Sequence, residues 1–131
     1  YYMDWKYVEP LVDSKSIENI EQKYKLEIPK KLKEVILKYN GGCPSKKVFD
    51  TKDSKERVVQ NLISYNKESK ESIYMYESIF NMEYIPFATT PFGDIICINK
   101  KTKAVELYLH EENKFEYICD DIDDFFKKLY N

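Results

Sequence analysis

An amphipathic pattern over residues 29–39 predicts the best-defined helix of the chain. Four apolar residues recur at the spacing of one helical face, with charged residues between them: Leu32, Val35, Ile36 and Tyr39. Pro29 suits the first turn, because its fixed φ is helical and its missing N–H has no intrahelical partner there. Asn40-Gly41-Gly42 ends the helix, since these residues tolerate the positive φ of a left-handed cap.

Three further segments have helical apolar stripes. Ile17, Ile20 and Tyr24 predict a helix over residues 14–24, and residues 73–80 fit one face of a short helix. The last helix carries a stripe of five apolar residues: Ile122, Phe125, Phe126, Leu129 and Tyr130. Aspartates stand at the start of this last helix and lysines at its end, an arrangement that the helix dipole favours.

Short apolar runs predict the strands. Three strands precede a turn at residues 89–94 and three follow it: residues 47–50, 58–65, 84–88, 95–98, 104–109 and 114–119. Pro86 places the third strand at a sheet edge, because proline cannot donate to a ladder. The run 95–98 is apolar on both faces and is expected to be a central strand.

The order of these elements predicts an α+β fold, with a largely antiparallel sheet and helices packed on one side of it. We expect residues 1–131 to form a single domain, since that length suits one hydrophobic core. Residues 1–12 are expected to be an N-terminal arm that packs on the body through Trp5 and Val8.

Composition and charge argue against several classes of protein. Hydrophobic residues make up 43% of the chain, yet no apolar run reaches the roughly 20 residues of a transmembrane helix. The 21 basic and 23 acidic side chains nearly balance, which argues against a general nucleic-acid binder. The 12 tyrosines suit an aromatic core and a protein interface equally well.

The cysteines and the single histidine argue against a metal site. Cys43, Cys97 and Cys119 lie far apart, and the chain has no C-x-x-C pair. An odd, unpatterned cysteine count fits a reducing compartment, so the cytoplasm is the expected location. Cys97 and Cys119 stand in apolar runs and are expected to be core residues. No cofactor is expected.

Three residues are candidates for catalysis, with simpler interpretations beside them. His110 follows a predicted strand and precedes Glu111 and Glu112, so it has carboxylates near it for acid–base work. Asp94 follows Gly93 and is a possible base or metal ligand. An enzyme acting through Asp94, Glu111 and His110 requires these groups to converge. Otherwise His110 is a surface turn residue and Asp94 fixes its turn by accepting hydrogen bonds.

Acidic residues near the end of the chain are the candidate partner-binding residues: Glu111, Glu112, Asp120, Asp121 and Asp124. One interpretation is solvation together with matching of the last helix dipole. The other is a negative surface that docks a basic protein, since complementary charge speeds encounter and selects partners.

Several positions together resemble the SMI1/KNR4 family, also called the SUKH superfamily, and the resemblance covers nearly the whole chain. The matching positions combine the proline-initiated helix, its Asn-Gly-Gly end, an Ile-Pro strand and a Gly-Asp turn: Pro29, Leu32, Asn40, Gly41, Gly42, Ile85, Pro86, Gly93 and Asp94. These positions look like fold markers, and the family has no shared catalytic residue to carry over.

The resemblance implies a function in protein binding. Bacterial proteins similar to this one are typically cytoplasmic immunity proteins that bind and neutralise polymorphic toxins, many of them nucleases. Eukaryotic members look like regulatory scaffolds, which is the alternative function. In either case the expected partner is a protein, with neither nucleic acid nor membrane as a direct partner, and no enzyme activity is expected. The sequence leaves the oligomeric state open.

Overall fold

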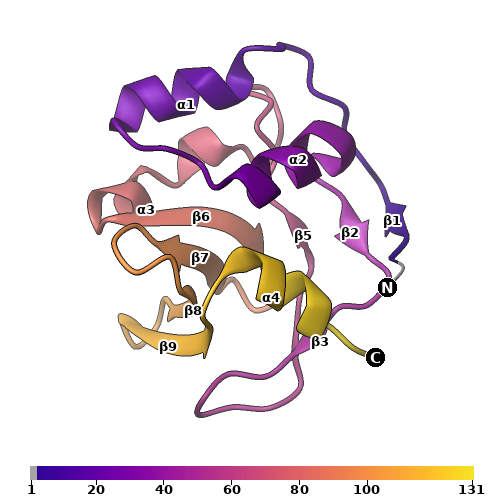
Figure 1. Cartoon of the computed structure of the whole chain (residues 1–131), viewed down its shortest axis with the longest axis vertical. Helices are drawn as coiled ribbons and strands as arrows, with labels where there is room; N and C mark the ends of the chain where they lie inside the picture. The colour runs from indigo at the N-terminus through magenta and orange to yellow at the C-terminus, as the bar shows by residue number, and fades with distance from the viewer. Residues whose placement is uncertain (1–2) are drawn as a thin grey trace.

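One antiparallel sheet of five strands forms the centre of the computed structural model, which describes residues 3–131. Its strands stand in the order β5-β6-β7-β8-β9, with these bounds: Asn61–Leu62, Tyr84–Thr89, Ile95–Asn99, Val105–Leu109 and Lys114–Cys119. Two pairs of shorter strands lie beside this sheet (Figure 1): β1 (Trp5–Lys6) with β2 (Cys43–Pro44), and β3 (Val48–Phe49) with β4 (Arg57–Val58). Tyr1 and Tyr2 of the predicted arm are outside the described residues.

Four α-helices occur in the described part of the chain: α1 (Ser16–Tyr24), α2 (Lys30–Tyr39), α3 (Glu77–Asn81) and α4 (Ile122–Lys128). A 3-10 turn over Ile73–Met75 precedes α3, so the short helix predicted over residues 73–80 is divided in two. α3 packs on β6, whereas α4 packs on β9 and reaches α2 (Figure 1). The predicted α+β fold with an antiparallel sheet is confirmed.

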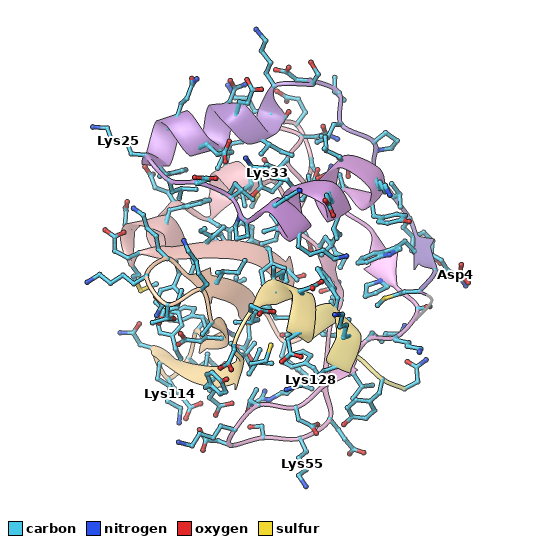
Figure 2. The ribbon with its side chains drawn as sticks, in the orientation of Figure 1. Asp4, Lys25, Lys33, Lys55, Lys114 and Lys128 are labelled. Carbon is cyan, nitrogen blue, oxygen red and sulfur yellow. The ribbon has the colours of Figure 1, made fainter. Side chains whose placement is uncertain are left out.

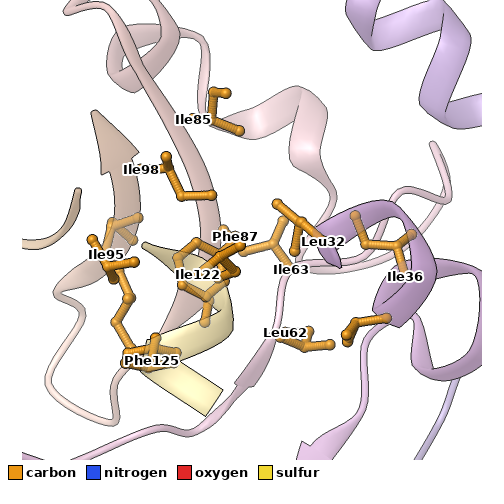
Figure 3. Packing of buried hydrophobic residues seen from close by; sticks show 14 of the residues in the cluster. Leu32, Ile36, Leu62, Ile63, Ile85, Phe87, Ile95, Ile98, Ile122 and Phe125 are labelled. Carbon is orange, nitrogen blue, oxygen red and sulfur yellow. The ribbon is translucent and has the colours of Figure 1, made fainter. Parts of the chain in front are cut away.

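The hydrophobic core lies between the sheet and the helices (Figure 3). The residues that meet there come from α2, β5, β6, β7 and α4, or directly follow β5: Leu32, Ile36, Leu62, Ile63, Phe87, Ile98 and Phe125. Phe125 makes edge contacts with Phe87 and Phe49, at ring-centroid distances of 5.5 and 5.7 Å. Burying each such side chain contributes about 1.5–3 kcal/mol to stability.

The meander β7-β8-β9 follows the predicted pattern. In β7 the residues Ile95 to Ile98 are all buried, and the strand occupies the middle of the sheet. In β8 the residues Val105, Leu107 and Leu109 are buried, while the intervening Glu106 and Tyr108 are partly exposed. Cys97 and Cys119 are buried free thiols, as expected.

The prediction that Pro86 places its strand at an edge is wrong, because β6 lies between β5 and β7. β5 is only two residues long and pairs with Ala88 and Thr89. At Pro86 the strand partner is Cys97 of β7, and the β6–β7 register shifts between Pro86 and Ala88. The missing N–H of proline is tolerated in this interior strand because the neighbour on the other side has already ended.

The strand predicted over residues 58–65 is also wrong in its extent. Val58 ends β4 and pairs with Val48, whereas Leu62 belongs to β5 and pairs with Ala88. The change of partner occurs at two consecutive amides: Val59 N donates to the carbonyl of Lys47, and Gln60 N donates to that of Thr89, each at 2.7 Å. One apolar run therefore serves two sheets, which local periodicity does not reveal.

The last helix ends earlier than predicted, at Lys128. Leu129 has extended backbone angles, and the Tyr130 N–H and carbonyl exchange hydrogen bonds with Val48, at 3.0 and 2.8 Å. Tyr130 was expected on the buried stripe of the helix, but it is 38% exposed. The chain end thus extends the β3–β4 pair instead of continuing the helix.

Asn40 does not form a left-handed cap, since its φ is −45° and Gly41 takes the positive φ of +70°. The Asn40 side chain is instead buried, and its Nδ2 donates to the carbonyl of Glu9 at 2.8 Å and to Ser64 Oγ at 3.0 Å. Its Oδ1 accepts a hydrogen bond from Tyr65 N at 2.8 Å. One side chain therefore joins α2, the N-terminal arm and the segment after β5.

The arm packs on the body through Trp5, as predicted. The Trp5 ring stacks on Tyr39 at a centroid distance of 5.0 Å and meets the edge of Phe126 at 6.0 Å. Gly42 makes room for this contact, because a Cβ there would lie 3.2 Å from both Trp5 and Val8.

Gly42→Ala is expected to destabilise the fold by about 1 to 2 kcal/mol. The added methyl would lie 2.8 Å from the Tyr39 carbonyl oxygen, so the end of α2 or the arm must move. Chemical denaturation measures the free energy of unfolding. A variant as stable as the wild-type protein would show that the arm does not pack closely over this glycine.

Candidate partner-binding surface

The acidic residues predicted to bind a partner form two groups at opposite ends of β9. Glu111 and Glu112 lie in the turn before this strand, and Asp120, Asp121 and Asp124 follow it. A strand of six residues spans roughly 17 Å between its first and last residue. In Figure 2, Lys114 marks the start of β9, and Lys128 lies on α4, which follows the end of β9. The five acidic residues therefore do not form one continuous patch.

The aspartates at and before α4 make hydrogen bonds and an ion pair within the chain. Asp121 caps the helix, with its Oδ1 accepting from Asp124 N at 2.8 Å, and Asp124 pairs with Lys128 at 3.1 Å. Asp120 accepts a hydrogen bond from the Tyr117 hydroxyl, and this bond raises the pKa of Tyr117 to about 12. Of these aspartates, Asp121 therefore stabilises the start of α4, Asp124 pairs within the helix, and Asp120 is bonded to β9.

Two of the three residues considered for catalysis come together in the structure. His110 Nδ1 lies 2.7 Å from Asp94 Oδ1, and the His110 backbone N–H donates to the same oxygen at 3.2 Å. Gly93 allows this approach, because it has a φ of +86° and a Cβ would lie 3.3 Å from the His110 ring. Among residues 3–131, no hydrogen bond or ion pair joins Glu111 to this pair.

Two residues that no sequence motif marks, Arg57 and Glu116, extend the Asp94–His110 pair into a network. Arg57 is the only arginine of the chain, and its Nη1 lies 3.8 Å from Asp94 Oδ2. Its Nη2 lies 3.9 Å from Glu116 Oε1, which also accepts a hydrogen bond from Thr51 Oγ1 at 2.9 Å. Glu116 faces the core because the β8–β9 register places it opposite Leu107. The only feature of the sequence that distinguishes Arg57 is that it is the single arginine of the chain.

The contacts of this network join segments that lie far apart in the sequence. A carboxylate that binds Nδ1 of a histidine resembles part of a catalytic triad, but a triad also needs a nucleophile beside Nε2. The hydroxyls of Thr51 and Ser54 donate to Glu116 instead, at 2.9 and 3.2 Å. The described residues also contain no cluster of side chains able to hold a metal ion. These hydrogen bonds and ion pairs connect the β3–β4 loop to β9 and to Asp94.

The sequence matches a known protein family over most of its length. The family model described as SMI1-KNR4 cell-wall (SUKH_6) matches residues 14–126. The chain belongs to the SMI1-KNR4 family. Among curated proteins none matches the sequence. The fold markers of the SMI1-KNR4 resemblance, from Pro29 to Asp94, all lie inside the matched range, whereas residues 1–13 lie outside it. No helix in the part of the chain that the structure describes has the length and apolar character of a membrane span.

Proposed function

We propose that this SMI1-KNR4 domain is a non-catalytic immunity protein that binds and neutralises a cognate bacterial polymorphic toxin. The proposed class of toxin is a nuclease. The match to the SMI1-KNR4 family over residues 14–126 carries the proposal. Free cysteines support a place in the reducing cytoplasm, where such a toxin acts. The domain binds the toxin directly and occludes its active site or its substrate surface.

The acidic residues are proposed to guide the encounter with a basic toxin. Asp120, Asp121 and Asp124 contribute at one end of β9, and Glu111 and Glu112 contribute at the other. Glu112 and Asp124 pair with the exposed side chains of Lys114 and Lys128, and exposed ion pairs contribute little energy, so these two carboxylates can exchange the lysines for cations of the partner.

Growth rescue tests the proposed function. Products of neighbouring genes are expressed in a sensitive host with and without this chain, and complexes are isolated by pull-down. A tight complex that restores growth supports immunity. Failure with every neighbouring product, together with capture of an unrelated regulatory protein, contradicts immunity and favours the scaffold function.

Charge reversal in Asp120→Lys and Asp124→Lys is expected to slow association with the toxin about tenfold at low salt and much less at high salt. Salt ions screen the long-range attraction between the acidic residues and a basic toxin, so the effect of the substitutions decreases as the salt concentration rises. Stopped-flow mixing at two salt concentrations measures the association rate. Glu68→Lys, a reversal in the exposed loop after β5, is the matched control. Equal rates for all variants at low salt would remove the acidic surface from the proposal.

A further inference from the structure

Asn40 is the only asparagine of the chain that a glycine follows. The other asparagines precede residues with a side chain or end the chain: Asn19, Asn61, Asn66, Asn81, Asn99, Asn113 and Asn131. Glycine has no Cβ, so its amide nitrogen can approach the preceding side chain without steric hindrance. By sequence alone, the Asn40-Gly41 pair is therefore the position of the chain most prone to deamidation.

Deamidation of this pair needs only water and a conformation that brings the two reacting groups together. The backbone nitrogen of Gly41 attacks the side-chain carbonyl carbon of Asn40 and forms a new C–N bond. The side-chain nitrogen of Asn40 leaves as ammonia, taking the proton of the Gly41 N–H. Water then opens the cyclic imide at either of its carbonyls. The product is aspartate or isoaspartate at position 40, and both carry a carboxylate that asparagine lacks.

The fold fixes the Asn40 amide by three hydrogen bonds. Its Nδ2 donates to the Glu9 carbonyl at 2.8 Å and to Ser64 Oγ at 3.0 Å, and its Oδ1 accepts from Tyr65 N at 2.8 Å. The reaction expels the nitrogen that donates two of these bonds, so both must break. The side chain is 1% exposed, so water does not replace the lost partners.

The peptide group between Asn40 and Gly41 is held as well. Glu9 N donates to the Asn40 carbonyl at 2.8 Å, and Gly42 N donates to the Tyr39 carbonyl at 2.8 Å. These bonds hold the backbone at a ψ of 128° for Asn40 and a φ of +70° for Gly41. Reaction therefore requires local or global opening of the fold, and open states are rarely populated.

The product does not fit the place that Asn40 occupies. A carboxylate has no N–H, so the Glu9 carbonyl and Ser64 Oγ lose their donor. The Ser64 hydroxyl already donates to Glu9 Oε1 at 3.2 Å, so it is not free to donate to a new carboxylate. The added charge is buried without a counter-ion, which is costly. Isoaspartate also lengthens the main chain by one carbon immediately before Gly41, whose φ is positive.

We propose that Asn40-Gly41 is a deamidation site that the fold protects, and that its modification in the unfolded chain prevents refolding. Unfolding is then reversible for a limited time only, because unfolded molecules are converted to a form that lacks the Asn40 contacts. The inference concerns this chain alone and holds whichever protein the domain binds.

Peptide mass mapping after incubation at mildly alkaline pH tests the inference on the complete chain. One sample contains guanidinium chloride and the other does not, and both contain a reducing agent that keeps the cysteines free. We expect Asn40 to deamidate faster than any other asparagine in the unfolded chain. We expect its deamidation in the folded chain to be at least about a hundredfold slower.

Refolding is measured on the same samples after dilution of the denaturant. The fraction that regains native fluorescence of Trp5 is expected to fall in step with the fraction of intact Asn40. Asn40→Gln is the matched control, because the longer side chain closes the corresponding ring far less readily, so its refolding yield is expected to stay constant during incubation. If this variant folds poorly, mass mapping of the refolded and unrefolded fractions of the wild-type chain replaces it.

A directly expressed product completes the test. Asn40→Asp is expected to be less stable than the wild-type protein, because it loses both donors of the amide. Equal deamidation of Asn40 in the folded and unfolded chain would overturn the protection by the fold. A refolding yield that stays high while Asn40 is lost, or an Asn40→Asp protein as stable as wild type, would show that the product is accommodated. Deamidation spread evenly over all asparagines would remove the special role of Gly41.

Discussion

Replacing Asn40 with alanine is expected to lower the free energy of unfolding by about 3 kcal/mol. The substitution removes three hydrogen bonds and leaves the buried Tyr65 N–H without its acceptor. The side chain is 1% exposed, so water does not replace the lost partners. Urea denaturation followed by tryptophan fluorescence measures the change, because Trp5 stacks on Tyr39 next to this residue.

Asn19→Ala is the matched control for Asn40, because Asn19 is an exposed residue of α1. We expect its free energy of unfolding to remain within about 0.5 kcal/mol of wild type. An Asn40→Ala protein with the same stability as this control would show that the arm and the segment after β5 do not depend on the asparagine. The family marker would then need another explanation.

Arg57→Met is expected to cost about 2 kcal/mol, because Asp94 and Glu116 keep their buried charges and lose their shared cation. The usual cost of breaking a buried pair is higher, but Arg57 is 29% exposed and water offsets part of the loss. Thermal or chemical unfolding measures the change in stability. Lys55→Met, an exposed substitution in the same loop, is expected to have little effect (Figure 2).

A second substitution tests the reason for the Arg57 effect. Glu116→Gln removes one of the two uncompensated charges, so the double variant is expected to be more stable than Arg57→Met alone. If both lose the same stability, the arginine acts through packing of its stem and not through charge.

The acidic residues and the Asp94–His110 network could be predicted only in part from the sequence. Sequence patterns indicate Asp94, His110 and the aspartates around residue 120 as candidates, and the structure joins Asp94 to His110. No pattern indicates Arg57 or Glu116, although these residues complete the network around Asp94. Glu116 is a polar residue between two aromatic residues, and nothing local shows that its side chain faces inward. Thr51 and Glu116 are separated by 65 positions, so no local pattern relates them.

Elements with a clear local period could be predicted from the amino-acid sequence alone. Residues 30–39 form a helix because their apolar stripe repeats at the helical period, and β8 forms a half-buried strand because its residues alternate. The order of the elements also indicates the α+β class, and the sequence matches the SMI1-KNR4 family over residues 14–126.

The pairing of the strands and the spaces that they enclose became evident from the three-dimensional structure. β6 is an interior strand despite Pro86, and the apolar run 58–65 divides between two sheets. A hollow beside Tyr117 and Tyr130 is likewise formed by segments from both halves of the chain. The physical reason is that periodicity reports which face of an element is apolar, whereas pairing, register and loop contacts depend on residues far away in the sequence.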